Sequence, residues 1–340
     1  LGLAQWASGN LEAAHRTFAD GLAGMQPLAV IVGTFVLADI QATLGRLHEA
    51  ARTCEHALQL ASEHGDRMPI GTEDVYTEIS KVHREWGDLE AAASDLATAK
   101  RLGDQVELPD WRYRWCIAQA RLQETLGDLD GALDLLDEAG RVYVRTPLPD
   151  VRPIAAMKAR VWVRQGKLAK AQSWAREQGL SADDDLTYLR EYEHVTLARA
   201  LIARYRNDRE ERSMHETMGL IERLLEEAEE GGRTGSAIEL LVLQALAHEA
   251  RGDLPPALVS LERALTLAEP QGYLRIFVDE GPPMATLLRE AAKQGIAPSY
   301  VFRVRAALGP TATSGAAARS SLVPQPLIEP LSERELEVLK

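Results

Sequence analysis

Six copies of one short pattern recur along the chain at intervals of about forty residues. In each copy a glycine is followed by a polar residue, a leucine, two variable residues and an alanine. The glycines are Gly9, Gly45, Gly87, Gly127, Gly166 and Gly252. They lie 36, 42, 40, 39 and 86 residues apart, and the last interval spans two periods with one degenerate copy between them. A period near forty is typical of stacked helical hairpins, so the pattern predicts an all-α solenoid.

Each part of the pattern suits a tight turn between two antiparallel helices. Glycine adopts the left-handed conformation that ends a helix, and the polar residue after it can cap the next helix. The alanine then places a small side chain one turn into the second helix. A second column of small residues stands seven residues before the glycines, at Gly2, Ala38, Ser80, Ala120, Ala159 and Ala245. Small residues on both helices at one level allow the two backbones of a hairpin to cross closely.

The degenerate copy can be placed by the same columns. Leu197–Arg199 resembles Gln119–Arg121, which puts Ala198 in the second small column and Tyr205 where the turn glycine should stand. Polar residues run from Asn207 to Ser213 before apolar spacing resumes. We therefore expect seven hairpins over residues 1–270, with a longer loop in this hairpin than in its neighbours.

The residues after the hairpins have a different character. Residues 271–309 predict a capping segment over the open end of the solenoid, with an extended or turn-rich stretch before two short helices. These helices are expected from Met284 to Gln294 and from Pro298 to Leu308. Residues 310–330 are rich in Ala, Ser, Thr, Gly and Pro without periodicity, which predicts a flexible linker. In residues 331–340, Ser332 and Glu335 form a capping box that begins another helix.

Composition and charge narrow the class of protein. The 340 residues are 46% apolar and 26% charged, which is ample for a continuous core. The formal net charge of −13 argues against binding of nucleic acid or an anionic membrane by these residues. The two cysteines, Cys54 and Cys116, lie in helical patterns without a partner at metal or redox spacing, and predict small core residues in a reducing cytoplasm. The longest apolar run, Leu28–Ala38, is far too short to span a bilayer.

The sequence offers no arrangement that supports catalysis. Gly231–Ser236 lacks the lysine and the spacing of a phosphate-binding loop, and predicts a helix break. His48–Glu49 and His248–Glu249 begin like a zinc-protease helix but lack its second histidine. Asp183–Asp185 is more typical of a segment that caps a helix than of a cation site. We therefore expect a protein region that is not an enzyme and holds no metal.

Three features together resemble one family of regulators. Residues 331–339, Leu-Ser-Glu-Arg-Glu-Leu-Glu-Val-Leu, resemble the opening of a LuxR-type helix-turn-helix domain. Residues 272–283, with the core Phe-Val-Asp-Glu-Gly-Pro-Pro, resemble the stretch that closes the superhelical sensor region of MalT-like regulators, the large ATP-binding regulators of the LuxR family. The repeats of residues 1–270 are similar to the tetratricopeptide-like sensor domain of that family, so the resemblance covers essentially the whole chain.

The resemblance implies a right-handed superhelix of tetratricopeptide-like hairpins within a cytoplasmic transcription activator. An ATP-binding domain would precede this region and a DNA-binding domain would follow it. The chain begins with leucine and stops just inside a helix, so we expect the natural protein to extend beyond both ends. ATP and DNA are then expected partners of the intact protein only, and no cofactor is expected here. A small-molecule inducer or a regulatory protein would act on this region and control self-association of the intact protein.

A row of cations follows the second small column. In four consecutive hairpins the residue after the small one is basic: Lys81, Arg121, Arg160 and Arg199. By resemblance to tetratricopeptide repeats this row faces the concave surface, where it would bind an anionic small molecule or an acidic peptide. The alternative is that these cations pair with acids on neighbouring helices, such as Glu124 or Glu78, and only order the stack.

Aromatic residues supply a second set of candidates. Trp111, Tyr113 and Trp115 cluster at the start of the fourth hairpin, and Tyr188 and Tyr192 begin the sixth. Near the groove rim a flat ring can stack on a sugar or a heterocycle. The alternative is that these rings fill gaps between repeats. The candidate ligand-binding residues are therefore Lys81, Arg121, Arg160, Arg199, Trp111, Trp115 and Tyr192.

Two functions remain open at this point. The first is an effector sensor of a MalT-like regulator, in which an inducer in the groove shifts a closed resting form toward an open self-associating one. The second is a helical-repeat scaffold that binds a protein or peptide and senses no small molecule.

Overall fold

A computed structural model describes residues 1–63, 68–106 and 110–308. Within these ranges every regular element is a helix. The predicted linker at 310–330 and the predicted helix start at 331–340 lie outside the described residues. The α-helices are α1 (Gly2–Ala7), α2 (Leu11–Leu22), α3 (Pro27–Thr43), α4 (Leu47–Ser62), α5 (Thr72–Glu85), α6 (Leu89–Gly103), α7 (Asp110–Leu126), α8 (Leu129–Val142), α9 (Ile154–Arg164), α10 (Leu168–Glu177), α11 (Glu191–Asp208), α12 (Glu211–Glu230), α13 (Thr234–Arg251), α14 (Leu254–Ala268), α15 (Arg275–Val278), α16 (Pro282–Lys293) and α17 (Pro298–Ala307). Two short 3₁₀ turns, η1 (Tyr188–Arg190) and η2 (Glu269–Gln271), stand before α11 and after α14.

Helices α1 to α14 pair in chain order into the seven predicted hairpins. All six turn glycines adopt the left-handed conformation, with φ between 72° and 88°. Asn10, Asp88 and Asp128 each accept a hydrogen bond from the backbone N–H three residues on, so the predicted caps form in three of the turns. The alanines of the pattern are fully buried: Ala14, Ala50, Ala92, Ala132, Ala171 and Ala257. The repeat pattern is thus confirmed as the hairpin crossing.

The sixth hairpin, α11–α12, differs from the expectation. Ala198 is fully buried in the small column, as predicted. The predicted long loop is wrong, because α11 continues through Tyr205 to Asp208 and only Arg209 and Glu210 separate it from α12. Arg209 takes the left-handed conformation in place of a glycine, with φ of 57°. Its guanidinium lies over the Tyr205 ring and donates a hydrogen bond to the backbone of α13, contacts that help to offset the strain.

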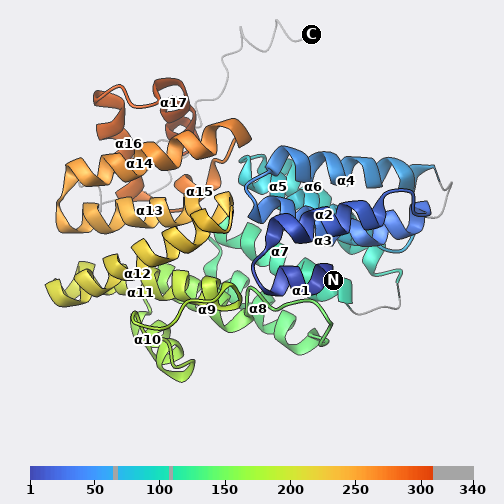
Figure 1. Ribbon diagram of the computed structural model, residues 1–340, viewed down its shortest axis with the longest axis horizontal. Coiled ribbons are helices and arrows are strands. Elements are labelled where there is room, and N and C mark those ends of the chain that lie inside the picture. The colour runs from blue at the N-terminus through green and yellow to red at the C-terminus, as the bar shows by residue number, and fades with distance from the viewer. Residues whose placement is uncertain (64–67, 107–109, 309–340) are drawn as a thin grey trace, which may run out of the picture.

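The superhelix closes on itself, so that its last hairpins contact its first ones. Figure 1 shows the blue and cyan hairpins of the N-terminal part facing the orange C-terminal part, with the green hairpins connecting them. The Trp86 indole donates a hydrogen bond of 2.8 Å to the Gln271 carbonyl. The Leu274 amide donates one of 2.9 Å to the Glu85 carbonyl. These bonds join the end of α5 to the segment that follows α14.

Two further contacts bring later hairpins against the first two. The Trp6 indole donates a hydrogen bond to the Tyr188 hydroxyl at 3.2 Å. Gly235, in the first turn of α13, lies so close to α3 that a Cβ on it would come within 2.9 Å of the Ala42 carbonyl oxygen. Only glycine permits this approach of two backbones. The closed form therefore depends on small residues as well as on hydrogen bonds.

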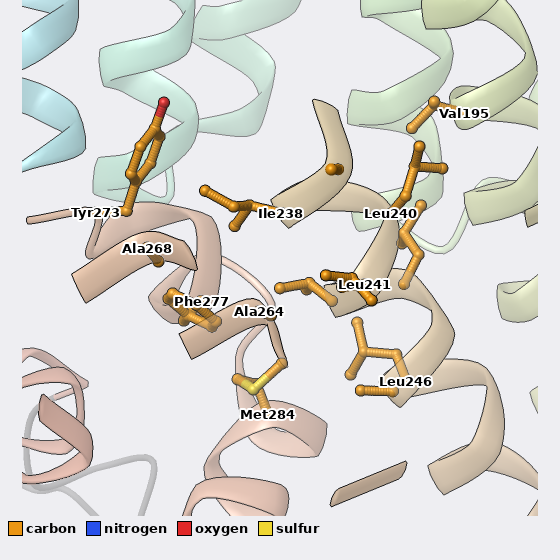
Figure 2. Packing of buried hydrophobic residues seen from close by; sticks show 14 of the residues in the cluster. Val195, Ile238, Leu240, Leu241, Leu246, Ala264, Ala268, Tyr273, Phe277 and Met284 are labelled. Atoms are coloured by element: carbon orange, nitrogen blue, oxygen red, sulfur yellow. The ribbon is translucent and has the colours of Figure 1, made fainter. Parts of the chain in front are cut away.

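The capping segment forms as predicted in outline. Helix α16 begins at Pro282, two residues before the expected start, because proline fits the first position of a helix. Helix α17 follows at Pro298–Ala307, and the turn-rich stretch before α16 contains the short helix α15. Figure 2 shows Phe277 and Met284 of this cap among side chains of α13 and α14. Phe277 is fully buried, so the cap belongs to the main core.

Other sequence expectations are resolved by the same coordinates. Cys54 and Cys116 are buried and free, and burial raises the pKa of the Cys54 thiol well above its usual range. Gly231–Ser236 spans the turn between α12 and α13 and the start of α13, as predicted. Asp184 accepts a hydrogen bond from the Ser181 amide and lies just ahead of η1. In the described ranges, no helix combines the length and apolar character that a membrane span requires.

Candidate ligand-binding cavities of the inner face

Three adjoining cavities lie along the inner face of the closed superhelix. The central cavity has a volume of about 280 Å³ and is lined by α3, α5, α7, α9, α11 and α13. The rim cavity, of about 150 Å³, lies beside the segment that connects α8 to α9. The arginine cavity, of about 390 Å³, lies between the solenoid and α15. The central and arginine cavities share the lining residues Arg84, Glu85, Arg121, Arg160 and Glu239. The arginine cavity has a volume typical of small-molecule sites, and the central cavity is only slightly smaller.

The predicted cation row does face this interior. Lys81, Arg121 and Arg160 line the central cavity, and Arg199 lines the arginine cavity. The equivalent position in the second hairpin, Asp39, also lines the central cavity. Successive first helices therefore place the equivalent residues of the stack along one face, as the repeat predicts.

The ion pairing that the alternative predicts is also present, because the cations of the row have carboxylate partners. Lys81 Nζ lies 2.5 Å from Glu78, on the preceding turn of α5. Arg121 lies 3.5 Å from Glu124, a longer contact of the same kind on α7. Glu78 and Glu124 are the two acids that the sequence named. The row is thus an ordered network of ion pairs rather than a strip of free positive charge.

Arg160 and Arg199 are the most tightly held members of the row. Both donate to the same oxygen of Glu239 on α13, at 2.7 and 2.9 Å, and Arg199 also donates to Glu280 at 2.6 Å. Burial alone would raise the pKa of Glu239, but the two guanidinium groups hold it at about 2. Arg160 also stacks on the Tyr192 ring, 3.7 Å from its centre. Tyr192 lines the central cavity as predicted, with one face covered by this cation.

The placement of the two tryptophans at the groove is wrong. Trp111 is buried and lies against Gly103, where a Cβ would come within 2.3 Å of its ring. Trp115 packs against α6 and donates to the Leu96 carbonyl at 2.8 Å. Neither lines any of the three cavities. Both rings fill the space between α6 and α7. This agrees with the alternative that these aromatic rings fill gaps between repeats.

The other aromatics of these clusters do reach the cavities. Tyr113 lines the rim cavity, and its ring centre is 5.1 Å from that of Tyr143. Tyr188 lines the central cavity. Burial raises the pKa of Tyr188 to about 12, so its hydroxyl is neutral at physiological pH. The rims of both cavities thus present phenol groups beside charged side chains.

Several lining residues were not identified from the sequence. Arg84 and Arg164 lie one helical turn beyond Lys81 and Arg160, so helical spacing from the row could have found them. Arg275 on α15 and Asp279 just after it reach the arginine cavity only because the superhelix closes. No local pattern in the sequence marks that contact.

Asp279 is surrounded by positive charge in this cavity. Arg84 lies 3.4 Å from it, and the Thr125 hydroxyl donates to it at 3.3 Å. Arg275 pairs with its other oxygen. Burial opposes the charge of Asp279, but Arg84, Arg275 and more distant arginines keep the pKa of its carboxyl below the usual range. The Asp279 carboxylate is thus one of the groups that fasten the cap to the solenoid.

The arginine cavity carries an excess of positive charge. Its described lining has seven arginines and five carboxylates. The arginines are Arg84, Arg121, Arg160, Arg164, Arg199, Arg206 and Arg275, and the carboxylates are Glu85, Glu124, Glu239, Asp279 and Glu280. Guanidinium groups bind anionic ligands through charge-assisted hydrogen bonds and electrostatic attraction.

Comparison with solved structures finds other helical proteins at low identity. A tetratricopeptide repeat protein from Parabacteroides merdae is 13% identical over 82% of this chain and 99% of its own, with a TM-score of 0.39. BtubC (BKLC) from P. vanneervenii is 17% identical over 85% of this chain and 99% of its own, with a TM-score of 0.30. A comparison with curated protein sequences finds no match.

The family comparison covers the whole solenoid and most of the cap. Residues 1–294 match the family described as the MalT-like TPR region. The match includes all seven hairpins and α15, and it ends just after α16. A helical-repeat region of this kind acts by binding other molecules along its curved surface. This chain belongs to the MalT-like TPR family.

Proposed function

We propose that this region is the effector-sensing domain of a MalT-like transcription regulator of the LuxR family. An effector binds in the cavities of the inner face and changes the balance between the closed form and an open form that self-associates. Self-association then controls transcription through a DNA-binding domain outside these residues. ATP would bind to the intact protein at a domain that precedes this region.

The observation that carries the proposal is the set of adjoining cavities, with charged side chains in their walls, inside a closed superhelix. The central cavity is lined by the first helices of six hairpins, α3, α5, α7, α9, α11 and α13. The adjoining arginine cavity is completed by α15 of the cap. A ligand that contacts groups on both the solenoid and the cap has different affinities for the closed and open forms. Such a difference in affinity is what a conformational switch requires.

The binding step can be tested with a variant that fills the cavity. Val151 lies in the connection between α8 and α9 and lines both the central and rim cavities. Thermal-shift screening of this chain against metabolites should find a compound that raises the melting temperature. Val151→Trp should remove that shift, whereas Val259→Trp, on an exposed part of α14, should retain it. A screen without any shift, or a shift that both variants retain, would contradict sensing in these cavities.

The regulatory step can be tested on the intact protein. The flanking coding sequence should encode an upstream phosphate-binding loop and a complete downstream helix-turn-helix domain. A transcription reporter should respond to the effector found in the screen, and Val151→Trp should abolish the response without lowering the amount of protein. If the flanking sequence encodes other domains, the role in transcription is refuted and only the ligand-binding part of the proposal stands.

A protein-binding scaffold is the second candidate, and the ion pairing of the inner row favours it. Arg160 and Arg199 already pair with Glu239 and Glu280, and these two carboxylates balance their charge without a ligand. A scaffold would bind a defined protein partner with the same affinity in Val151→Trp and in the wild type. It would also show no melting-temperature shift with any metabolite, which separates it from the sensor.

A further inference from the structure

We propose that the arginine cavity is a phosphate site that binds the phosphate monoester group of a small molecule. Arg84, Arg121 and Arg164 would bind the group in competition with Asp279 of the cap. The inference deepens the proposed function, because it names the chemical class of the effector and the residues that recognise it. The four groups come from α5, α7, α9 and from the residue after α15, so the site joins three hairpins to the cap.

The first reason is that these three arginines are only loosely satisfied by the protein. Arg121 and Arg164 both lie 3.5 Å from the same oxygen of Glu124, and Arg84 lies 3.4 Å from Asp279. Charge-assisted hydrogen bonds are ordinarily 2.7 to 2.9 Å long, roughly the distance at which Arg160 binds Glu239. Arg84 also lies 3.8 Å from Glu85, so the three guanidinium groups meet their carboxylates only at 3.4 to 3.8 Å and retain free donor capacity.

The second reason is the charge of the cavity. Seven arginines and five carboxylates line the cavity, and an excess of positive charge remains even though one arginine, Arg206, pairs with Glu249 outside the lining. Burial raises the pKa of Glu85, one of the five carboxyl groups, although the neighbouring Arg84 opposes this change. A phosphate monoester carries close to two negative charges at neutral pH and would balance the excess. Its three terminal oxygens also match donors that arrive from three different helices.

The third reason is that Asp279 already occupies the middle of the cluster as an internal anion. Arg84, Arg121, Arg164 and Arg275 all act on its carboxylate. The Thr125 hydroxyl, 3.3 Å from the same oxygen that faces Arg84, is a neutral donor at the same place. A phosphate group offers more charge and more acceptor atoms than one carboxylate does. It would therefore displace Asp279 and remove one of the bonds that hold the cap on the solenoid.

The size of the cavity is consistent with a molecule larger than the phosphate group. Its volume of about 390 Å³ is the largest of the three cavities described here. It continues into the central cavity through Arg84, Glu85, Arg121, Arg160 and Glu239. The body of the ligand would then extend from the arginine cluster toward Tyr192.

Inorganic phosphate is the probe for this site. Its binding to the chain should be saturable at pH 7.5 and constant ionic strength, measured by isothermal titration calorimetry. Arg121→Gln and Arg164→Gln should each weaken it about tenfold, since each removes a charge-assisted hydrogen bond. Arg263→Gln is the matched control, because this arginine is exposed, pairs with Glu229 and lies outside the cavities. Its phosphate affinity should equal that of the wild type.

A second variant distinguishes a phosphate site from a general loss of structure. Asp279→Asn removes the internal competitor and should bind phosphate several-fold more tightly, whereas Asp130→Asn on an exposed part of α8 should not. A gain in affinity cannot arise from misfolding. Non-saturable binding, or equal affinities in Arg121→Gln, Arg164→Gln, Asp279→Asn and the wild type, would overturn the inference.

Failure of this inference can be told apart from failure of the sensor. If phosphate does not bind but a neutral metabolite gives a shift that Val151→Trp removes, sensing stands and only the phosphate site is lost. If neither phosphate nor any metabolite binds, both proposals fail.

Discussion

Glu239 should contribute stability that disappears in acid, because its carboxylate is shared by two buried arginines. The pKa of Glu239 is about 2 in the folded chain, against 4.5 for an unperturbed glutamic acid. Each unit of difference corresponds to about 1.4 kcal/mol, so ionised Glu239 stabilises the fold by about 3 kcal/mol at pH 7. Its side chain is 21% exposed, so solvent screening removes only part of this free energy.

The sign of the pH dependence follows from the lowered pKa. A carboxyl group that binds its proton more weakly in the folded state stabilises that state at any pH above 4.5, its unfolded value. The contribution falls as the pH drops from 4.5 toward 2, and at pH 3 about 1 kcal/mol of it remains. The Glu239→Gln variant lacks this titration. Its stability should therefore approach that of the wild type as the pH is lowered.

Urea unfolding at pH 7 and at pH 3 measures this difference. Glu239→Gln should lower the free energy of unfolding by about 3 kcal/mol at pH 7 and by about 1 kcal/mol at pH 3. The matched control is Glu229→Gln, which removes an exposed pair with Arg263 and should change stability by less than about 1 kcal/mol at either pH. An equal loss for Glu239→Gln at both pH values would refute the reasoning, since a packing defect is not titrated.

Three further predictions concern the closed form and its parts. Gly235→Ala should lower the free energy of unfolding by about 1 to 3 kcal/mol in urea, because the new Cβ would press on the Ala42 carbonyl; an unchanged midpoint would show that α13 can move away. Phe277→Ala should cost about 3 to 5 kcal/mol by the same measurement, since the ring is fully buried in the core, and a loss below 1 kcal/mol would place the cap outside the cooperative unit. His83 donates a hydrogen bond to the Asp95 carboxylate at 2.7 Å, and this bond raises the pKa of the imidazole above 6.5. The stability that His83 adds should therefore be present below pH 6.5 and lost as the pH rises through the raised pKa, so His83→Gln should be more harmful at pH 6 than at pH 9.

The fold could be predicted from the sequence wherever local conformation decided it. Six glycines mark six turns because the left-handed conformation is costly for other residues. The sixth hairpin is an exception, because its turn residue is Arg209 and not glycine. Arg209 adopts the left-handed conformation and is held in it by contacts with Tyr205 and with the backbone of α13. A non-glycine residue in this region of φ gives no signal in its own sequence. The error was therefore confined to one loop.

Only those site residues that occupy equivalent positions in successive repeats could be predicted from the sequence. The cation row follows from the period, because equivalent residues of stacked hairpins line up on one face. Trp111 was misplaced because its ring occupies the space left by Gly103, and this pairing exists only in three dimensions. Asp279 entered the site from a segment that lies some 195 residues from Arg84 in the chain. Closure of the superhelix creates that contact, and no periodic pattern encodes it.

Closure of the superhelix also couples ligand binding in the arginine cavity to docking of the cap. The arginine cavity has walls on α5, α7 and α9 of the solenoid and on the capping segment. The same segment is fastened to α5 by the Leu274 amide, the Ile276 amide and the Asp279 carboxylate. A ligand that competes with any of these bonds must weaken cap docking, and docking must weaken ligand binding by the same factor. The dependence is reciprocal, so Asp279→Asn should at once loosen the cap and strengthen phosphate binding. Loosening without stronger binding would show that Asp279 fastens the cap but does not compete for the site.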